Sequence, residues 1–491
     1  MRASPNVVRA GVAVLVVLAC ALVYLGGPSR RGASTSVPPT DAGAPTRPDA
    51  ASLPRIDPRP RDDARPDILL LTIDSVRADH TSAYGYDRET TPTLRALAAR
   101  GTRFDRAYST ASWTSPSIAS LLTGVLPSQH GVTQLHIVPD GGVETEALSA
   151  ELPSLASSLH DVGYRTMGVT VTPLLDAAVG FGRGFDEYAC LGFVDRETVR
   201  SSLGSRIEHL RASDTPYFLW IHIIDPRIPH TPTDPQFSTW WPATRARHPT
   251  LDFALSGIAL GAILIRDQIP IPEGIEYATT AWDSEIRSAD DFLEHVLVEL
   301  DDRHLAVVVT SDHGEELNEH HRVGHGSTLF EEVVHVPLVI ALPDQEASVA
   351  TPLVSLIDVL PTLLELADAP IPEGIAGRSL MPAMRSEAFP LTRDIVMETG
   401  GTTLVRGIFD GRYKYAERLM PTHIEALFDV EEDPYEEHSI LAAHPEIADP
   451  LRARLHATLD AAAARRPEAV TVELPITALP RHQLQTLGYA N

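Results

Sequence analysis

The sequence predicts an α/β protein with a mainly parallel β-sheet sandwiched by helices and a small antiparallel subdomain near its C-terminus. From Asp67 onward, apolar β-branched runs such as Ile68 to Ile73 alternate with helical patterns. This alternation is typical of parallel sheets buried on both faces. After about Arg393, short runs are separated by glycine and Asp-Gly turns, which favours an antiparallel sheet.

The first 26 residues are expected to form a membrane anchor. Val7 to Leu25 is an uncharged, apolar run of about 19 residues, close to the ~20 that span a bilayer as a helix. A cleaved signal peptide is the alternative, with Cys20 in a weak lipobox-like context, but the apolar run continues past it. Residues 27–66, rich in Pro, Ala, Asp and Arg, are expected to form a disordered linker.

Residues 67–390 form the predicted catalytic domain. Its strand-like runs are Ile68 to Ile73, Arg165 to Val171, Tyr217 to Ile224, Leu305 to Thr310 and Leu338 to Leu342. Its helical patterns are Thr91 to Arg100, Leu152 to Val162 and Ser284 to Leu300. An apolar patch from Phe253 to Ile265 is too short to span a membrane and predicts a buried insertion helix or lid.

Residues 391–491 form the predicted C-terminal subdomain, with a closing helix near Pro450 to Ala464. Lys414 is expected to be an exposed lysine, and the alternative is that it contributes positive potential to the site. The formal net charge of −26 argues against a nucleic-acid partner. Beyond the first 26 residues Cys190 is the single cysteine, so this part of the chain has no internal disulfide.

A hydroxyl-rich loop that runs into a short apolar helix suggests a nucleophile. The stretch Ala107 to Gly124 reads AYSTASWTSPSIASLLTG, with Pro116 where a first turn tolerates proline and Gly124 where a helix stops. A helix N-terminus stabilises an oxyanion or a phosphate-like ester near Thr114. The alternative is an ordinary capped helix.

Two other segments favour the nucleophile. The runs ending at Asp74 and at Asp312 are strand-like and finish in acidic and imidazole groups. Ligands of open α/β sheets bind at strand C-termini. Asp74, Asp312 and His313 therefore form a candidate set for one divalent metal ion, with Mn, Mg, Ca and Zn all left open.

At these residues the chain resembles the sulfatase family of the alkaline phosphatase superfamily. The resemblance covers about Pro66 to Leu441, in family order, and includes AYSTASWTSPSIASLLTG, TIDSVRADHTSAYGY, SDHGEELNEHHRVGHGS, GRYKYAE and LFDVEEDPYEE. It implies an alkaline-phosphatase-like fold, a metal on Asp74, Asp312 and His313, and a nucleophile at Thr114 that also contacts the metal.

The chain departs from the family at sulfate-specific positions. The formylglycine precursor is Cys or Ser in the family but Thr114 here, and threonine cannot be oxidised to that aldehyde. The family's following Arg is Ile118, its second acidic residue is Ser75, and its PHxP histidine is Arg227. What remains resembles the phosphodiesterases and phosphoglycerol transferases that use an unmodified threonine.

We therefore expect a membrane-anchored, metal-dependent hydrolase or transferase, outside the cytoplasm (in the periplasm or extracellular), that acts on small-molecule, lipid or glycan phosphate esters through Thr114. His222 and His325 are the candidates for protonating the leaving group. Arg77 and Asp79 are expected to brace the first loop. The alternatives are a sulfuric ester hydrolase without formylglycine and a catalytically silent binding protein.

Overall fold

The computed structural model describes residues 65–474, apart from 139–141, 195, 213–214, 227–232, 243–244, 246, 249–262, 265, 301–303 and 402. The predicted anchor and nearly all of the linker lie outside these residues, as does most of the patch from Phe253 to Ile265. Within the described ranges, no helix combines the length and the apolar character that crossing a bilayer requires.

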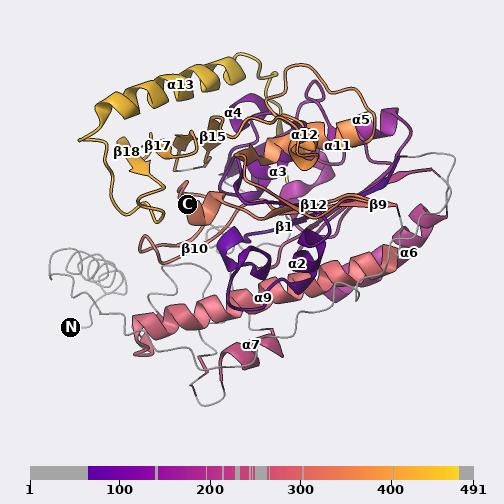
Figure 1. The fold of residues 1–491 in the computed structure, drawn as a ribbon, viewed down its shortest axis with the longest axis horizontal. Helices are drawn as coiled ribbons and strands as arrows, with labels where there is room; N and C mark the ends of the chain where they lie inside the picture. The colour runs from indigo at the N-terminus through magenta and orange to yellow at the C-terminus, as the bar shows by residue number, and fades with distance from the viewer. Residues whose placement is uncertain are drawn as a thin grey trace, which may run out of the picture. The chain divides into compact units, whose positions relative to one another are not determined.

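The catalytic part is built on an eight-stranded sheet in the order β13-β2-β12-β9-β1-β8-β6-β7 (Figure 1). Its strands are β1 (Asp67–Ile73), β2 (Thr102–Phe104), β6 (Arg165–Thr170), β7 (Glu187–Cys190), β8 (Tyr217–Ile223), β9 (Leu305–Ser311), β12 (Leu338–Ala341) and β13 (Ser348–Ala350). The five strands from β9 to β7 pair in parallel, while β12 is antiparallel to both of its neighbours. The mainly parallel sheet predicted from the sequence is confirmed.

Helices cover both faces of this sheet (Figure 1). Ile68 and Leu70 of β1 belong to one apolar core, whereas Leu69 and Leu71 belong to the core on the opposite face. Alternation along a strand therefore explains why the whole run is apolar. The first core includes side chains of α3 (Thr114–Thr123), α5 (Leu155–Asp161) and α11 (Val359–Leu366). The second includes side chains of α2 (Pro92–Ala98), α6 (Arg196–Arg211) and α9 (Ile271–Leu300).

Shorter elements connect this framework. They are η1 (Ala78–His80), η2 (Ser82–Tyr84), β3 (Ala107–Tyr108), α4 (Pro127–His130), β4 (Leu135–Ile137), β5 (Val143–Glu146), η3 (Pro173–Leu175), η4 (Ala177–Val179), α7 (Gln236–Trp240), β10 (Glu316–Leu317), β11 (Val323–Gly324), α10 (Glu331–Val334), β14 (Val354–Ser355), η6 (Leu356–Asp358), α12 (Met381–Met384) and β19 (Thr471–Glu473).

The C-terminal subdomain contains the antiparallel sheet expected from its turns. Its strands, in sheet order, are β15 (Ile395–Glu398), β16 (Val405–Phe409), β17 (Tyr413–Arg418) and β18 (Ile424–Asp429). Helix α13 (Pro445–Ala463) packs on this sheet through Leu451 and Leu455, which share an apolar core with Ile408 and Tyr415. The predicted closing helix is thus present and begins a few residues earlier than expected.

Lys414 of β17 joins the small sheet to the catalytic part. Its side chain is 1% exposed and its Nζ lies 2.6 Å from Oε1 of Glu331 and 3.0 Å from Oε1 of Glu436. Nζ also donates to the backbone carbonyl of Leu329 at 3.2 Å. The expectation of an exposed lysine was wrong, because two carboxylates from separate segments compensate the buried ammonium.

Candidate active site

The hydroxyl of Thr114 lies at the start of α3. Thr114 is the first helical residue, Trp113 precedes it in an extended conformation, and Gly124 ends the helix in the left-handed conformation, as the sequence predicted. Thr114 is 1% exposed. The first N–H groups of a helix have no partner within the helix, so α3 presents backbone donors beside this hydroxyl.

Polar contacts hold α3 in place. Ser117 donates from Oγ to the backbone carbonyl of Asp312 at 2.6 Å, which links α3 directly to the end of β9. The Nε2 atom of buried His130 lies 3.2 Å from the carbonyl of Pro116 and 3.1 Å from Oγ of Ser120. His130 therefore supports the helix.

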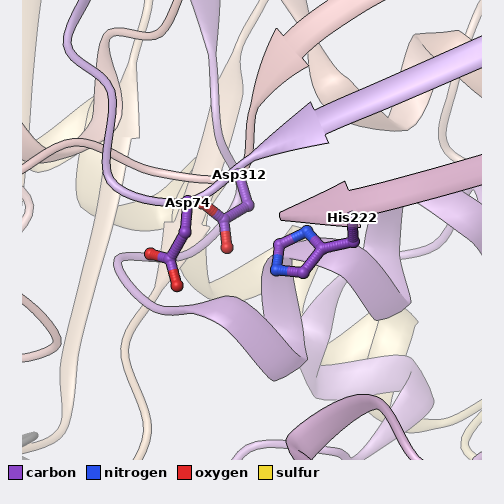
Figure 2. A group of neighbouring side chains, drawn as sticks. All are labelled: Asp74, His222 and Asp312. Carbon is purple, nitrogen blue, oxygen red and sulfur yellow. The ribbon is translucent and has the colours of Figure 1, made fainter. Parts of the chain in front are cut away.

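Three side chains meet where adjacent strands end. Asp74 follows β1, Asp312 follows β9, and His222 is the penultimate residue of β8. Each offers one ligand atom, and these atoms lie within 4.8 Å of one another. Figure 2 shows the His222 ring extending from its strand towards the two carboxylates. Because β9, β1 and β8 are neighbours in the sheet, residues more than 200 positions apart share one site.

His313 and Thr114 complete this cluster. The Nε2 atom of His313 lies 3.4 Å from Oδ1 of Asp74, 3.6 Å from Oδ2 of Asp312 and 3.5 Å from Oγ1 of Thr114. Its Nδ1 atom lies 2.8 Å from the carbonyl oxygen of Gly314, which can only accept a hydrogen bond. The ring proton of neutral His313 is thus on Nδ1, and the Nε2 lone pair faces the carboxylates. The structure brings the four predicted residues together.

Burial and charge make these residues fit a divalent cation. Burial, followed by repulsion from Asp312, raises the pKa of Asp74 to about 7, and burial also raises the pKa of Asp312 to about 7. Burial lowers the pKa of His313 to about 4. Among the described residues, Oδ2 of Asp312 is buried without a hydrogen-bond partner. A cation held by Asp74, Asp312, His313 and Thr114 would relieve this crowding of acceptors.

Ser75 orients both carboxylates. It has a φ of 58°, its Oγ donates to Oδ1 of Asp74 at 2.6 Å, and its backbone N–H donates to Oδ1 of Asp312 at 3.3 Å. The left-handed conformation of Ser75, between the segments that carry Asp74 and Asp312, is a local strain of the kind found at functional sites.

Arg77 braces the same loop as expected, since its guanidinium donates twice to Asp79 and once to the backbone carbonyl of Glu315.

His325 lies beside the cluster and is paired with Glu315. Its Nδ1 atom is 3.0 Å from Oε2 of Glu315, and its ring centroid is 4.3 Å from that of His313. Burial opposes the charged ring, but the carboxylate of Glu315, with those of Asp74 and Asp312, raises the pKa of His325 to about 9. The imidazolium is therefore the prevailing form at neutral pH, as a proton donor requires.

His222 has the opposite character. Burial, with a smaller contribution from His313, lowers its pKa to about 3, so the ring is neutral at pH 7. His222 and His325 were both predicted to protonate the leaving group, but their surroundings give them different protonation states. Glu315 was missed altogether, because nothing in SDHGEELNE distinguishes its carboxylate from those of Glu316 and Glu319. Arg227 lies outside the described residues.

Comparisons with known proteins find relatives over most of the chain. The sulfatase family model matches residues 66–369, and a model of the C-terminal part of N-sulphoglucosamine sulphohydrolase matches residues 320–465. The chain is 25% identical over 480 residues to the Delta 4,5-hexuronate-2-O-sulfatase of Bacteroides thetaiotaomicron, an alignment that covers 87% of this chain and 94% of that protein.

Solved structures with a similar fold include both sulfur and phosphorus chemistry. The phosphonate monoester hydrolase of Agrobacterium radiobacter superimposes with a TM-score of 0.65 at 19% identity, covering 85% of this chain and 99% of that one. A protein solved in complex with its substrate D-glucosamine-2-N,6-O-disulfate superimposes with a TM-score of 0.66 at 17% identity, covering 82% of this chain and 99% of that one.

Proposed function

The chain belongs to the sulfatase family, and from this premise we propose that it is a metal-dependent hydrolase or transferase of phosphate esters that acts through Thr114. The observation that carries the proposal is the position of the Thr114 hydroxyl, at the N-terminus of α3 and 3.5 Å from Nε2 of His313, beside Asp74 and Asp312. A nucleophile, oxyanion donors and metal-type ligands therefore converge on one point.

The residues divide the reaction between them. The Thr114 hydroxyl gives up its proton to solvent and its oxygen attacks phosphorus, while the N–H groups at the start of α3 hold the equatorial oxygens. A divalent cation on Asp74, Asp312 and His313 supplies Lewis-acid chemistry, which lowers the pKa of a contacting hydroxyl. His325 donates its proton to the leaving oxygen, and the phosphorus–oxygen bond breaks as the proton arrives. Water or a second hydroxyl then attacks phosphorus and passes its proton to the now neutral His325, and the bond between phosphorus and Oγ1 of Thr114 breaks, which restores both residues.

Threonine favours phosphorus over sulfur as the reacting atom. A formylglycine enzyme releases sulfate by elimination from its aldehyde hydrate, whereas a sulfated threonine has no such exit. A phosphorylated threonine can be released by a second in-line attack. The related phosphonate monoester hydrolase supports this reading at the level of fold.

Sulfuric ester hydrolysis without formylglycine is the second candidate. It is favoured by the 25% identity to a hexuronate-2-O-sulfatase and by the fold shared with a protein that binds a disulfated glucosamine. Both neighbours make a glycan a reasonable substrate scaffold under either chemistry. We also propose that Val7 to Leu25 anchors the enzyme to a membrane and that the catalytic domain lies outside the cytoplasm.

A substrate screen with a matched variant pair tests the proposal. Wild-type protein, Thr114→Ala and Thr114→Ser are compared on nitrophenyl phosphate, a nitrophenyl phosphodiester and nitrophenyl sulfate, with Mn²⁺, Mg²⁺, Ca²⁺ and Zn²⁺. Thr114→Ala should lose at least about 10³-fold in kcat while its Tm stays close to that of the wild type. Thr114→Ser keeps a hydroxyl and should retain part of the activity. Faster turnover of the sulfate would favour the second candidate.

A further inference from the structure

The two ring nitrogens of His222 differ in their contacts, because Nδ1 has a hydrogen-bond partner and Nε2 has none among the described residues. Nδ1 lies 2.9 Å from Oγ1 of Thr72, its register partner on β1. Nε2 is buried and has no hydrogen-bond partner in the part of the chain that the structure describes. The ring reaches the space shared by Asp74 and Asp312 (Figure 2). The position of its single proton therefore decides what the open nitrogen can do.

The partners of Thr72 fix that proton. The indole N–H of Trp220 can only donate, and it lies 3.1 Å from Oγ1 of Thr72. The carbonyl of Ile221 can only accept, and it lies 3.4 Å from the same oxygen. A hydroxyl has one proton and two lone pairs. All three contacts are satisfied when Thr72 donates to Ile221 and accepts from both Trp220 and Nδ1 of His222.

This arrangement leaves a bare lone pair on Nε2. The ligand atoms of His222, Asp74 and Asp312 lie within 4.8 Å of one another, and among the described residues Nε2 of His222 has no hydrogen-bond partner. We infer that Nε2 of His222 binds the divalent cation together with Asp74 and Asp312, and that Thr72 and Trp220 are positioning residues that hold the ring in the ligating tautomer. The inference rests on the proposed function, which places a cation at the same centre.

The donor set then selects the class of metal. Two neutral imidazoles, His222 and His313, and two carboxylates suit a first-row transition ion of the Mn²⁺ to Zn²⁺ series. Ca²⁺ prefers an all-oxygen set of six to eight ligands. The prediction from sequence left Mn, Mg, Ca and Zn open and assigned His222 to proton transfer. Its fixed Nδ1 proton makes the nitrogen set larger than the sequence indicated.

Zn²⁺ and Ca²⁺ binding to the full chain, purified in detergent without a polyhistidine tag, tests this inference. Affinities are measured by competition with chromogenic chelators. His222→Ala should weaken Zn²⁺ binding by about 10²-fold or more and change Ca²⁺ binding much less. Thr72→Val should weaken Zn²⁺ binding about 10- to 100-fold, and Thr72→Ser, which keeps the hydroxyl, should restore it.

The matched control is Thr310→Val. Thr310 is the register neighbour of Thr72 on β9, and its buried hydroxyl donates to the carbonyl of Pro337 at 2.8 Å instead of contacting a histidine. This variant should keep wild-type Zn²⁺ affinity even if it lowers the Tm. A Thr310→Val loss equal to that of Thr72→Val would overturn the positioning role, because loss of any buried strand hydroxyl would then suffice.

The outcomes separate this inference from the proposed function. If ester turnover depends on Thr114 but His222→Ala binds Zn²⁺ as tightly as the wild type, the assignment of His222 as a ligand is overturned and the proposed function stands. If His222→Ala loses Zn²⁺ affinity while the wild type turns over no ester, the ligand assignment stands and the proposed function fails.

Discussion

At the scale of single residues, contacts formed by distant segments set the protonation states of His222 and His325. Asp74, Asp312 and His313 follow strand-like runs, and the structure places them together within a few ångströms of Thr114. The difference between His222 and His325 was not predictable, because it depends on contacts with Thr72 and Glu315. Such contacts are formed only after distant segments pack, so neither histidine's protonation state follows from its neighbours in sequence.

The pH dependence of activity should report the pair formed by His325 and Glu315. The pKa of His325 is raised to about 9 in the folded protein, so the proton needed by the leaving group is present at neutral pH and is lost as pH rises through about 9. Glu315→Gln removes the main cause of the increase. The alkaline limb of the kcat/KM profile should therefore move to lower pH.

The pair formed by His325 and Glu315 also makes the stability of the protein depend on pH. Like the activity, this stability falls as the pH rises through about 9. A histidine whose pKa is raised on folding stabilises the protein most below its unfolded value near 6.5, and this contribution is lost as pH rises through about 9. An alkaline limb that stays in place in Glu315→Gln would contradict the role given to His325. A proton donor matters more for alkyl phosphates, which have poor leaving groups, than for nitrophenyl phosphates. If His325→Ala loses activity equally on both, His325 acts in binding or structure and not as the proton donor.

At the scale of elements, the sheet was predictable because its strands are buried on both faces and therefore read as continuous apolar runs. The start of α9 was not predictable. The helix was expected to begin at Ser284, and in the structure it begins at Ile271. The first half of this helix is covered by its contact with α7 rather than by the sheet, as shown by the cluster of Phe237, Trp241 and Tyr277. A helix that packs on two different surfaces has no single apolar stripe.

Helix α9 also caps α2. Both oxygens of buried Asp290 accept backbone N–H groups, from Thr93 at 2.7 Å and from Leu94 at 2.9 Å. Asp290→Ala would leave two buried donors unpaired and should lower the free energy of unfolding by about 1–3 kcal/mol or more, measured by urea denaturation.

The neighbouring residue provides the control for Asp290. Asp291 pairs with Arg287 in a partly exposed, one-turn contact at 2.9 Å, so Asp291→Ala should cost no more than about 0.5 kcal/mol. If the two variants lose equal stability, the capping role assigned to Asp290 is wrong.

At the scale of the whole molecule, the described residues contain apolar cores in the catalytic part and in the C-terminal subdomain. Polar contacts between distant segments add to these cores. Buried Lys414 pairs with Glu331 and Glu436, and Arg65 donates to the carbonyl of Val162 at 2.6 Å. These long-range pairs were beyond sequence reasoning, because Lys414 is the single lysine of the chain and nothing in its neighbours shows that it is buried between two carboxylates. The expected membrane anchor and linker stay predictions.

Removal of residues 1–64 should yield a protein that is folded, active and no longer bound to membranes. Arg65 is retained because its guanidinium contacts the catalytic part. The checks are a cooperative thermal transition, unchanged kcat/KM on the preferred ester, and fractionation between membrane and supernatant. Loss of cooperative unfolding in the truncated protein would show that the apolar segment belongs to the core.

The most direct test of the account is the mass of the enzyme during turnover. Wild-type protein and Thr114→Ala are mixed in excess with a phosphodiester substrate, quenched with acid, and digested for peptide mass spectrometry. We expect the peptide that contains Thr114 to carry the mass of a phosphoryl ester in the wild type, and no modified peptide in Thr114→Ala. Turnover of the ester by Thr114→Ala at the wild-type rate, with no adduct in either protein, would contradict the threonine mechanism.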